Sequence, residues 1–281
     1  DRLPQMRAAA ARAAELAPDA AMTLHALANV ARGEGRFVVA EQLYARSIAS
    51  DPSYPDVRED YAEFLIAVGR TDDALKASRE LVALEPMVKV FWYRIAQLAI
   101  LLDRDDLEAE AGRMLELDPM YYFGLTVPFR RAYTHGRFDE ARREMERAYA
   151  INPEAVAAEW VLFRWSQKEP VITDEYARQA ILGGYGWDYP QFAAFAGDAD
   201  LYFAALRSPR DADKHFYAYN HLEVPAVAKY LADPRAIDVL RQAGFEAYWR
   251  EKGWPALCRP LGEHDFECSH RAPVATAGTR P

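Results

Sequence analysis

The stretch His135-Gly136-Arg137-Phe138-Asp139-Glu140-Ala141, which continues through Met145 and Ala148 to Asn152-Pro153, indicates a turn, one amphipathic helix and a stop. Glycine suits the turn, because it adopts a positive φ without strain. Proline suits the stop, because its ring is not tolerated in the interior of a helix. The stretch therefore predicts a short helix with a fixed beginning and end.

The same phrase recurs along the first half of the chain. Copies begin at Gly35-Arg36 and Gly69-Arg70, and a degenerate copy begins at Asp103-Arg104. The prolines that end the copies are spaced 34, 34, 33 and 34 residues apart, at Pro18, Pro52, Pro86, Pro119 and Pro153. A fixed period of this length predicts a repeat protein in which each unit buries its apolar face against its neighbours.

This pattern is similar to that of tetratricopeptide repeat proteins, and the similarity covers about residues 1–155. The resemblance implies an all-α fold, a right-handed α-solenoid of antiparallel helix pairs. Small residues stand where the two helices of a pair would approach closely; they are Ala28, Ala62 and Ala96 in the first helices and Ala40, Ala74 and Ala141 in the second helices.

The period also sets the expected boundaries. We expect a partial repeat at 1–20, repeats at 21–54, 55–88, 89–121 and 122–155, a degenerate repeat with an irregular helical C-terminal cap at 156–270, and a flexible tail at 271–281. Repeat three has Asp103 where the other repeats have glycine, and it is one residue shorter before Pro119. Its second helix is therefore expected to be distorted.

The composition is that of a folded protein and argues against several partner classes. The 281 residues are 51% hydrophobic and 27% charged, and the formal net charge is −9. This negative balance disfavours binding to nucleic acid and to anionic membrane surfaces. No apolar run approaches the roughly 20 residues that a membrane-spanning helix needs. The chain begins at Asp1 without a signal-like segment, and we interpret it as a processed protein or a piece of a longer one.

The chain carries none of the common catalytic and cofactor-binding motifs. The sequence lacks His-Glu-x-x-His, Gly-x-Ser-x-Gly, a phosphate-binding glycine loop and a paired-cysteine zinc motif. We therefore predict a non-catalytic protein with no catalytic residue, cofactor or metal. One alternative is an enzyme with its site in the aromatic-rich region 185–260, lined by Tyr185, Trp187, Tyr189, Tyr202, Tyr217, Tyr219 and Trp249. A purely structural scaffold is the other alternative.

The end of the chain carries a second resemblance. Tyr248-Trp249, Gly253-Trp254-Pro255 and Asp265-Phe266-Glu267-Cys268 resemble the closing segment of tetratricopeptide regions in two kinds of bacterial protein. These are winged-helix regulators of the acid-response type and class III adenylate cyclases. Neither activity transfers, because this chain has neither a winged helix nor the metal-binding residues of a cyclase. The resemblance implies the C-terminal part of a bacterial signalling or transcription-regulating protein.

The two cysteines of the chain, Cys258 and Cys268, both fall in this last segment. A disulfide would hold a segment that has little core of its own, and two reduced thiols packed among the nearby aromatic residues are the alternative. A zinc site with two nearby histidines fits no common zinc-finger spacing. We favour the disulfide. A bridge would indicate a periplasmic location, because disulfides persist outside the reducing cytosol, and free thiols would indicate a cytoplasmic one.

The concave face is the candidate binding surface, for a protein or peptide partner. In this repeat class, the first helix of each pair lines that face at its second, fifth, ninth and twelfth positions. The groove residues predicted in this way are His25, Asn29, Arg32, Asp56, Glu59, Glu63, Tyr93, Gln97, Arg130, Tyr133, Trp160 and Arg164.

The predicted groove is acidic toward its start and rich in aromatic residues and arginine toward its end, where binding anchors are often found. We expect Arg130 and Arg164 to contact an acidic partner. Only Asn29 matches the lysine-and-asparagine clamp that holds the terminal carboxylate of chaperones. Acidic residues at the start of the groove would repel such a tail, so we do not expect one to bind.

Overall fold

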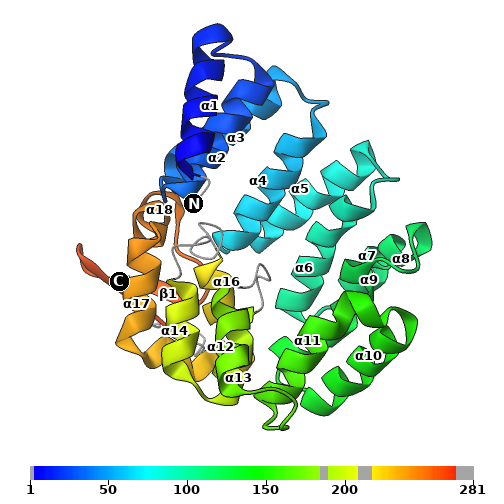
Figure 1. The fold of residues 1–281 in the computed structure, drawn as a ribbon. Helices are drawn as coiled ribbons and strands as arrows, with labels where there is room; N and C mark the ends of the chain where they lie inside the picture. The colour runs from blue at the N-terminus through cyan, green and yellow to red at the C-terminus, as the bar shows by residue number, and fades with distance from the viewer. Residues whose placement is uncertain (1–2, 184–188, 208–216, 270–281) are drawn as a thin grey trace, which may run out of the picture.

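The structure is a computed structural model that describes residues 3–183, 189–207 and 217–269. The predicted tail at 271–281 lies outside these residues. The described chain is mostly helical, and successive antiparallel helix pairs stack side by side as an α-solenoid of the tetratricopeptide type (Figure 1). The first part of the chain forms α1 (Leu3–Leu16), α2 (Ala21–Gly33), α3 (Phe37–Ser50), α4 (Pro55–Ala67), α5 (Thr71–Leu84), the 3-10 turn η1 (Lys89–Phe91), α6 (Trp92–Leu102), α7 (Asp105–Ala111), α8 (Arg113–Leu117), α9 (Tyr122–Thr134), α10 (Phe138–Ile151) and α11 (Pro153–Ser166).

The turn within each pair has the same backbone structure in three repeats. Gly35, Gly69 and Gly136 have φ angles of 70°, 82° and 74°, a region that glycine adopts without strain. The N–H of the arginine that follows each glycine donates to a carbonyl five residues earlier, at 2.9 Å in all three turns. Asp103 has the same left-handed conformation in the third repeat, with φ 52°. Aspartate is one of the few residues that tolerate this region.

The second helix of the third pair is broken, in agreement with the distortion that the sequence predicts. α7 ends at Ala111 and α8 begins at Arg113, with Gly112 between them. The Gly112 N–H is shared between the carbonyls of Glu108 at 2.9 Å and Ala109 at 3.2 Å. The altered turn at Asp103 and the lost residue are therefore followed by two short helices where the other pairs have one long helix.

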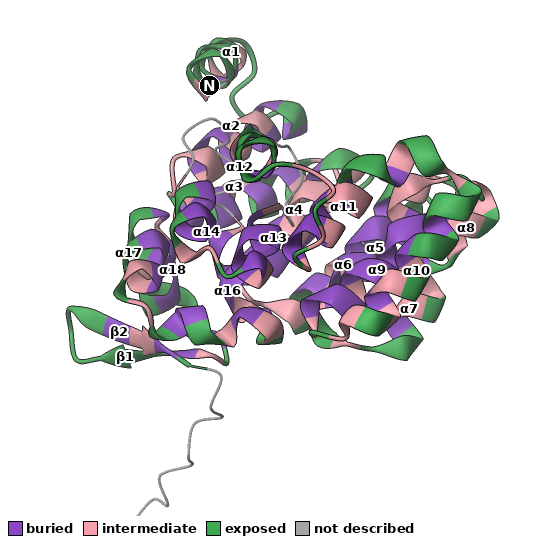
Figure 2. Cartoon of the chain, turned by 60° about the horizontal axis from the view of Figure 1, so that its bottom comes forward, coloured by how far each residue is buried: buried purple, intermediate pink, exposed green. Residues whose placement is uncertain are grey.

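Small residues allow the paired helices to approach closely. The six alanines named for this role, which include Ala28, Ala62 and Ala141, are fully buried. Figure 2 shows the buried residues gathered where the helices face one another and the exposed residues on their outer sides. Packing of this kind supplies most of the stability of short helices.

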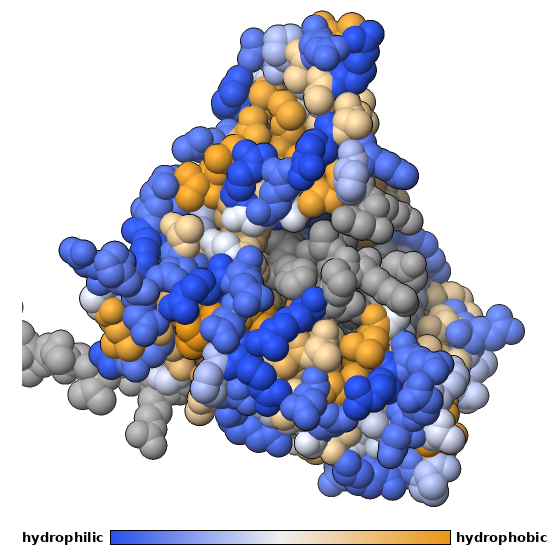
Figure 3. Space-filling view, turned by 60° about the vertical axis from the view of Figure 1, so that its left-hand side comes forward, coloured by the Kyte–Doolittle hydropathy of each residue, from blue (hydrophilic) through white to orange (hydrophobic). Residues whose placement is uncertain are grey.

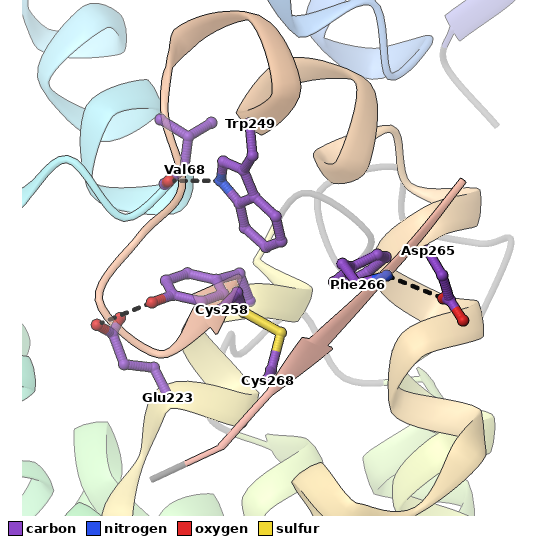
Figure 4. The surroundings of a disulfide bond; sticks show 8 residues. Val68, Glu223, Trp249, Cys258, Asp265, Phe266 and Cys268 are labelled. Carbon is purple, nitrogen blue, oxygen red and sulfur yellow. Dashed lines mark hydrogen bonds between the residues drawn. A yellow bond between two sulfur atoms is a disulfide. The ribbon is translucent and has the colours of Figure 1, made fainter. Parts of the chain in front are cut away.

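After α11 the chain forms an irregular cap. Its elements are α12 (Asp174–Gly183), α13 (Tyr189–Ala196), α14 (Ala199–Leu206), α16 (Ala218–Glu223), the 3-10 segment η2 (Pro225–Ala232), α17 (Pro234–Gln242), α18 (Phe245–Lys252), β1 (Cys258–Leu261) and β2 (Asp265–Cys268). The sequence predicts a helical cap and misses the hairpin of β1 and β2, which pair in antiparallel register from Cys258↔Cys268 to Leu261↔Asp265. A disulfide joins Cys258 to Cys268, whose Cα atoms lie 4.0 Å apart (Figure 4).

The cap returns to the first repeats, so that the chain closes on itself (Figure 1). The Trp249 indole N–H of α18 donates to the Val68 carbonyl at 3.0 Å (Figure 4). The Asn220 amide of α16 donates to the Ile66 carbonyl, also at 3.0 Å. Both carbonyls lie at the C-terminal end of α4, next to the turn into α5. The cap is therefore hydrogen-bonded to the array at the end of α4, where the chain turns into α5.

The face in Figure 3 is mostly hydrophilic, with separate patches of apolar residues. Among the residues that the structure describes, Leu16 and Met22 have the most exposed large apolar side chains, each at 71%. Within the described residues, no helix combines the length and the apolar character needed to cross a bilayer.

Candidate functional site

Polar side chains of the first helices form two hydrogen-bonded groups that follow one another along neighbouring helices. We call these two groups together the polar ladder. It consists of His25, Asn29 and Arg32 on α2, Glu59, Asp60 and Glu63 on α4, Tyr93, Arg94 and Gln97 on α6, Arg130 on α9 and Glu159 on α11.

The beginning of the polar ladder is centred on Asp60. Its Oδ2 lies 2.6 Å from Nε2 of His25 and accepts a hydrogen bond from the Asn29 amide at 2.7 Å. Burial alone would raise the pKa of Asp60, but the hydrogen bond from His25 and the charge of Arg32 hold that pKa below its ordinary value. Tyr44 donates to the Asn29 carbonyl oxygen at 2.5 Å. The Asp60 carboxylate thus stays ionised in a largely enclosed place.

The middle of the polar ladder alternates in charge. Arg32 donates to one oxygen of Glu63 at 2.9 Å, and Arg94 lies 2.9 Å from the other oxygen. Arg94 also donates from Nε to Glu59 at 2.8 Å. The Tyr217 hydroxyl, from the segment just before α16, donates to Glu63 as well. The cap therefore reaches the inner face of the array, which is the face lined by the first helices of the pairs. There it contacts the same carboxylate as the two arginines.

The far end of the polar ladder is a fully buried ion pair. Arg130 and Glu159 are joined by hydrogen bonds of 2.5 and 3.1 Å, and their side chains are only 2% and 1% exposed. Arg130 also donates to the hydroxyls of Tyr93 and Tyr122, each at 2.8 Å. Removing one member of such a pair leaves an uncompensated buried charge, so the pair is a structural element of the inner face.

The structure places the predicted groove residues in four different environments. Eight of them belong to the polar ladder; they are His25, Asn29, Arg32, Glu59, Glu63, Tyr93, Gln97 and Arg130. Asp56 is exposed at the start of α4. Tyr133 is fully buried in an aromatic cluster, 5.4 Å from the Phe129 ring and 4.4 Å from the Phe195 ring. Its assignment to an open groove is therefore wrong.

Trp160 and Arg164 lie apart from the polar ladder, because α11 presents a different face from the one predicted. Glu159 takes the inner position on this helix and pairs with Arg130. Trp160 instead packs against Arg142 of α10 and against Arg164. The acidic partner expected for Arg130 is also not supported, because its guanidinium is buried against Glu159.

Sequence reasoning missed Asp60, Arg94, Glu159 and Tyr217. The first three lie directly beside a predicted position on the same helix, because the inner stripe is wider than one residue per turn. The sequence nevertheless contains a pattern that could have identified residues of this kind. The ladder pairs Asn29–Asp60 and Arg130–Glu159 are separated by 31 and 29 residues, close to one repeat. Complementary polar residues about one repeat apart mark neighbouring first helices.

Three of the aromatic residues named for the cap belong to the hydrophobic core. Tyr185 and Trp187 lie outside the described residues. Tyr202, Tyr219 and Trp249 are buried, and the rings of Tyr219 and Trp249 are 5.1 Å apart in an edge-on contact. Among the residues that the structure covers, no group of three His, Cys, Asp or Glu side chains is arranged to hold a metal ion.

Residues 31–98 match the family model described as Tetratricopeptide repeat. The match begins near the end of α2 and ends within α6, and it supports a tetratricopeptide repeat protein. No curated protein matches the chain. Tetratricopeptide repeats generally mediate protein–protein interaction, and the family is typically non-enzymatic. The match therefore supports a non-catalytic interaction module.

Proposed function

We propose that this chain binds a protein or peptide partner on the inner face of the solenoid, at the part formed by α2, α4 and α6. The observation that carries the proposal is the exposure of carboxylates on α4. Glu59 and Asp60 keep 18% and 19% of their side chains accessible, and Asp56 beside them is exposed. Glu59, Asp60 and Glu63 share two arginines, Arg32 and Arg94, and Asp56 adds an exposed carboxylate, so the accessible part of this face favours basic side chains of a partner.

The module is the C-terminal part of a bacterial signalling or transcription-regulating protein. The closing segment around Trp249 and Trp254 supports this role through its resemblance to such regulators. The Cys258–Cys268 disulfide supports a location outside the reducing cytosol, the periplasm. Mass spectrometry of the protein taken unreduced from its native compartment and alkylated under denaturing conditions tests the location. An exported protein carries no alkylated cysteine, and two alkylated cysteines contradict the proposal.

Site-specific photo-crosslinking in the native cells tests the binding face. A photoreactive residue replaces Asp56 on α4 in one variant and Lys76 in the other, and Lys76 is exposed on α5, the second helix of the same pair. The proposal predicts a defined protein crosslinked from position 56 and not from position 76. Equal capture from both positions, or capture from position 76 alone, contradicts the inner face as the binding site. A purely structural scaffold predicts no defined product from either position.

A further inference from the structure

A second polar arrangement lies where α10 and α11 pack side by side, away from the polar ladder. The Arg142 guanidinium carbon is 5.6 Å from the Trp160 ring centroid, and the Arg164 guanidinium carbon is 5.5 Å from the same centroid. We call these three side chains the Arg–Trp–Arg stack. The Trp160 ring also stacks on Phe163, with centroids 5.8 Å apart and ring planes at 14°. The indole therefore packs against Phe163 and lies close to both cations.

Both guanidiniums converge on one carboxylate, that of Glu169. Arg164 donates from Nε to Oε2 at 2.6 Å, and Arg142 donates from Nη2 to Oε1. The Glu169 backbone is fixed in turn, because its N–H donates to the Arg164 carbonyl at 3.1 Å. The two arginines lower the pKa of Glu169, which keeps it ionised. The stack is thus already shaped to receive a carboxylate.

The arrangement is accessible, in contrast to the buried Arg130–Glu159 pair. The side chains of Arg142, Arg164 and Glu169 are 35%, 37% and 28% exposed. Ion pairs with this degree of exposure contribute little net stability, so an incoming carboxylate can replace Glu169 at small cost. Each guanidinium uses one nitrogen on Glu169 and retains further N–H donors. Within the described residues, the Trp160 indole N–H also donates to no acceptor.

We propose that the Arg–Trp–Arg stack is a docking point for an acidic segment of a protein partner, whose carboxylate takes the place of Glu169 between the two guanidiniums. Charge complementarity selects the acidic segment, and arginine and tryptophan are the residue types that most often carry binding energy at protein interfaces. The inference rests on the proposed binding role, but it names a surface other than the acidic part of the inner face. A partner that uses both surfaces has a basic segment and an acidic segment.

A titration with hexaglutamate peptide, followed by NMR at the indole N–H signals, tests the proposal on the whole chain. The Trp160→Phe variant assigns the Trp160 signal among the 6 tryptophans. We expect a saturable shift of this signal with hexaglutamate and none with hexalysine. Glu169→Gln should tighten hexaglutamate binding about fivefold, because it removes a competing like charge a few ångströms away. The double variant Arg142→Gln/Arg164→Gln should weaken binding roughly tenfold or more.

The matched control is Glu116→Gln. Glu116 lies on α8 and pairs with a single arginine, Arg113, so its replacement changes the net charge by the same amount outside the stack. Circular dichroism verifies that each variant is folded. If the double variant is unfolded, the effect of Glu169→Gln on hexaglutamate binding tests the docking point on its own. The proposal is overturned if the Trp160 signal does not move with hexaglutamate, or if Glu169→Gln and Glu116→Gln have the same effect. If position 56 nevertheless captures a partner, the binding role stands and only the docking point fails.

Discussion

At the scale of single residues, two positive-φ glycines of the fold have different physical roles. Gly136 turns the chain between α9 and α10, and a Cβ atom there would meet only the Ala226 Cβ at an ordinary 3.6 Å. Gly244 joins α17 to α18 against the first repeat, and a Cβ atom there would lie 2.2 Å from the Gly35 carbonyl oxygen. Gly136 is therefore required by its backbone conformation alone. Gly244 is also required by the close approach of its backbone to that of Gly35.

Gly136→Ala should lower the free energy of unfolding by about 1–2 kcal/mol, because alanine is strained in the left-handed region. Gly244→Ala should cost distinctly more, since either the backbone of the Gly35 turn or the cap must move. Urea unfolding of both variants measures the difference. Equal losses for the two variants would show that the cap does not approach the first turn as closely as the structure indicates.

Glu223 is a titratable residue that sets a pH dependence for the cap. Tyr219 donates to its Oε1 at 3.4 Å, and within the described chain its Oε2 is buried without a hydrogen-bond partner. Burial raises the pKa of Glu223 from 4.5 to about 7. Between these two pH values the folded state therefore holds a proton that the unfolded state has lost. The free energy of unfolding must fall as the pH rises through this window.

Glu223→Gln removes this proton uptake. Relative to the variant, the wild type should lose on the order of 3 kcal/mol of unfolding free energy between pH 4.5 and pH 7. Below pH 4.5 the two proteins should keep a constant difference. Urea unfolding across this range, with the variant as the reference, cancels the contributions of the other titratable groups. Parallel pH profiles for the two proteins would mean that Glu223 is solvated.

At the scale of elements, the hairpin is the least self-sufficient part of the fold. β1 and β2 have four residues each, and a two-stranded hairpin is at best marginally stable alone. The Cys258–Cys268 bridge closes it, and the Phe266 ring packs 6.1 Å from Trp249 and 5.4 Å from Trp254. The disulfide therefore helps to hold the Phe266 ring against Trp249 of α18, the helix that is hydrogen-bonded to Val68 at the end of α4.

The double variant Cys258→Ala/Cys268→Ala should lower the free energy of unfolding by about 2–3 kcal/mol, the loss typical for a short closed loop. The loss should be local, because the hairpin packs against α17 and α18 in the cap. Hydrogen exchange should become faster in α18 and in the hairpin and stay unchanged in α9 and α10. Faster exchange throughout the array would contradict this division and would mean that the bridge supports the whole fold.

The sequence predicts the array well, because its period, turn glycines and alanines are local signals that repeat. The sequence does not predict that the cap packs against the first repeats. The hydrogen bond from Trp249 to Val68 joins residues 181 positions apart, and no periodic pattern in the sequence indicates it. The candidate site is predicted in part. Eight of the predicted positions lie in the polar ladder. On α11, however, Glu159 rather than Trp160 takes the inner position. The face that α11 presents depends on its packing against α9 and α13, and helix periodicity alone does not predict that packing.

At the scale of the whole molecule, the array and the cap act together on the inner face. Tyr217 contacts Glu63 from the cap side, while Arg32 and Arg94 contact the same carboxylate from the array. Arg94 is buried, and charges in such a place must remain paired. The polar ladder therefore fixes the spacing of α2, α4 and α6, and the partly exposed carboxylates of α4 are left for a partner. Rigid placement of a charged face lowers the ordering cost of binding.

The central claim is that the inner face of this solenoid binds a protein partner. Hydrogen–deuterium exchange of the chain, alone and with the partner captured from position 56, measures it most directly. The account predicts slower exchange in peptides from α2 and α4 when the partner is bound, and no change in α3 and α5. Protection confined to α3 and α5, or no protection anywhere in the array, would contradict it.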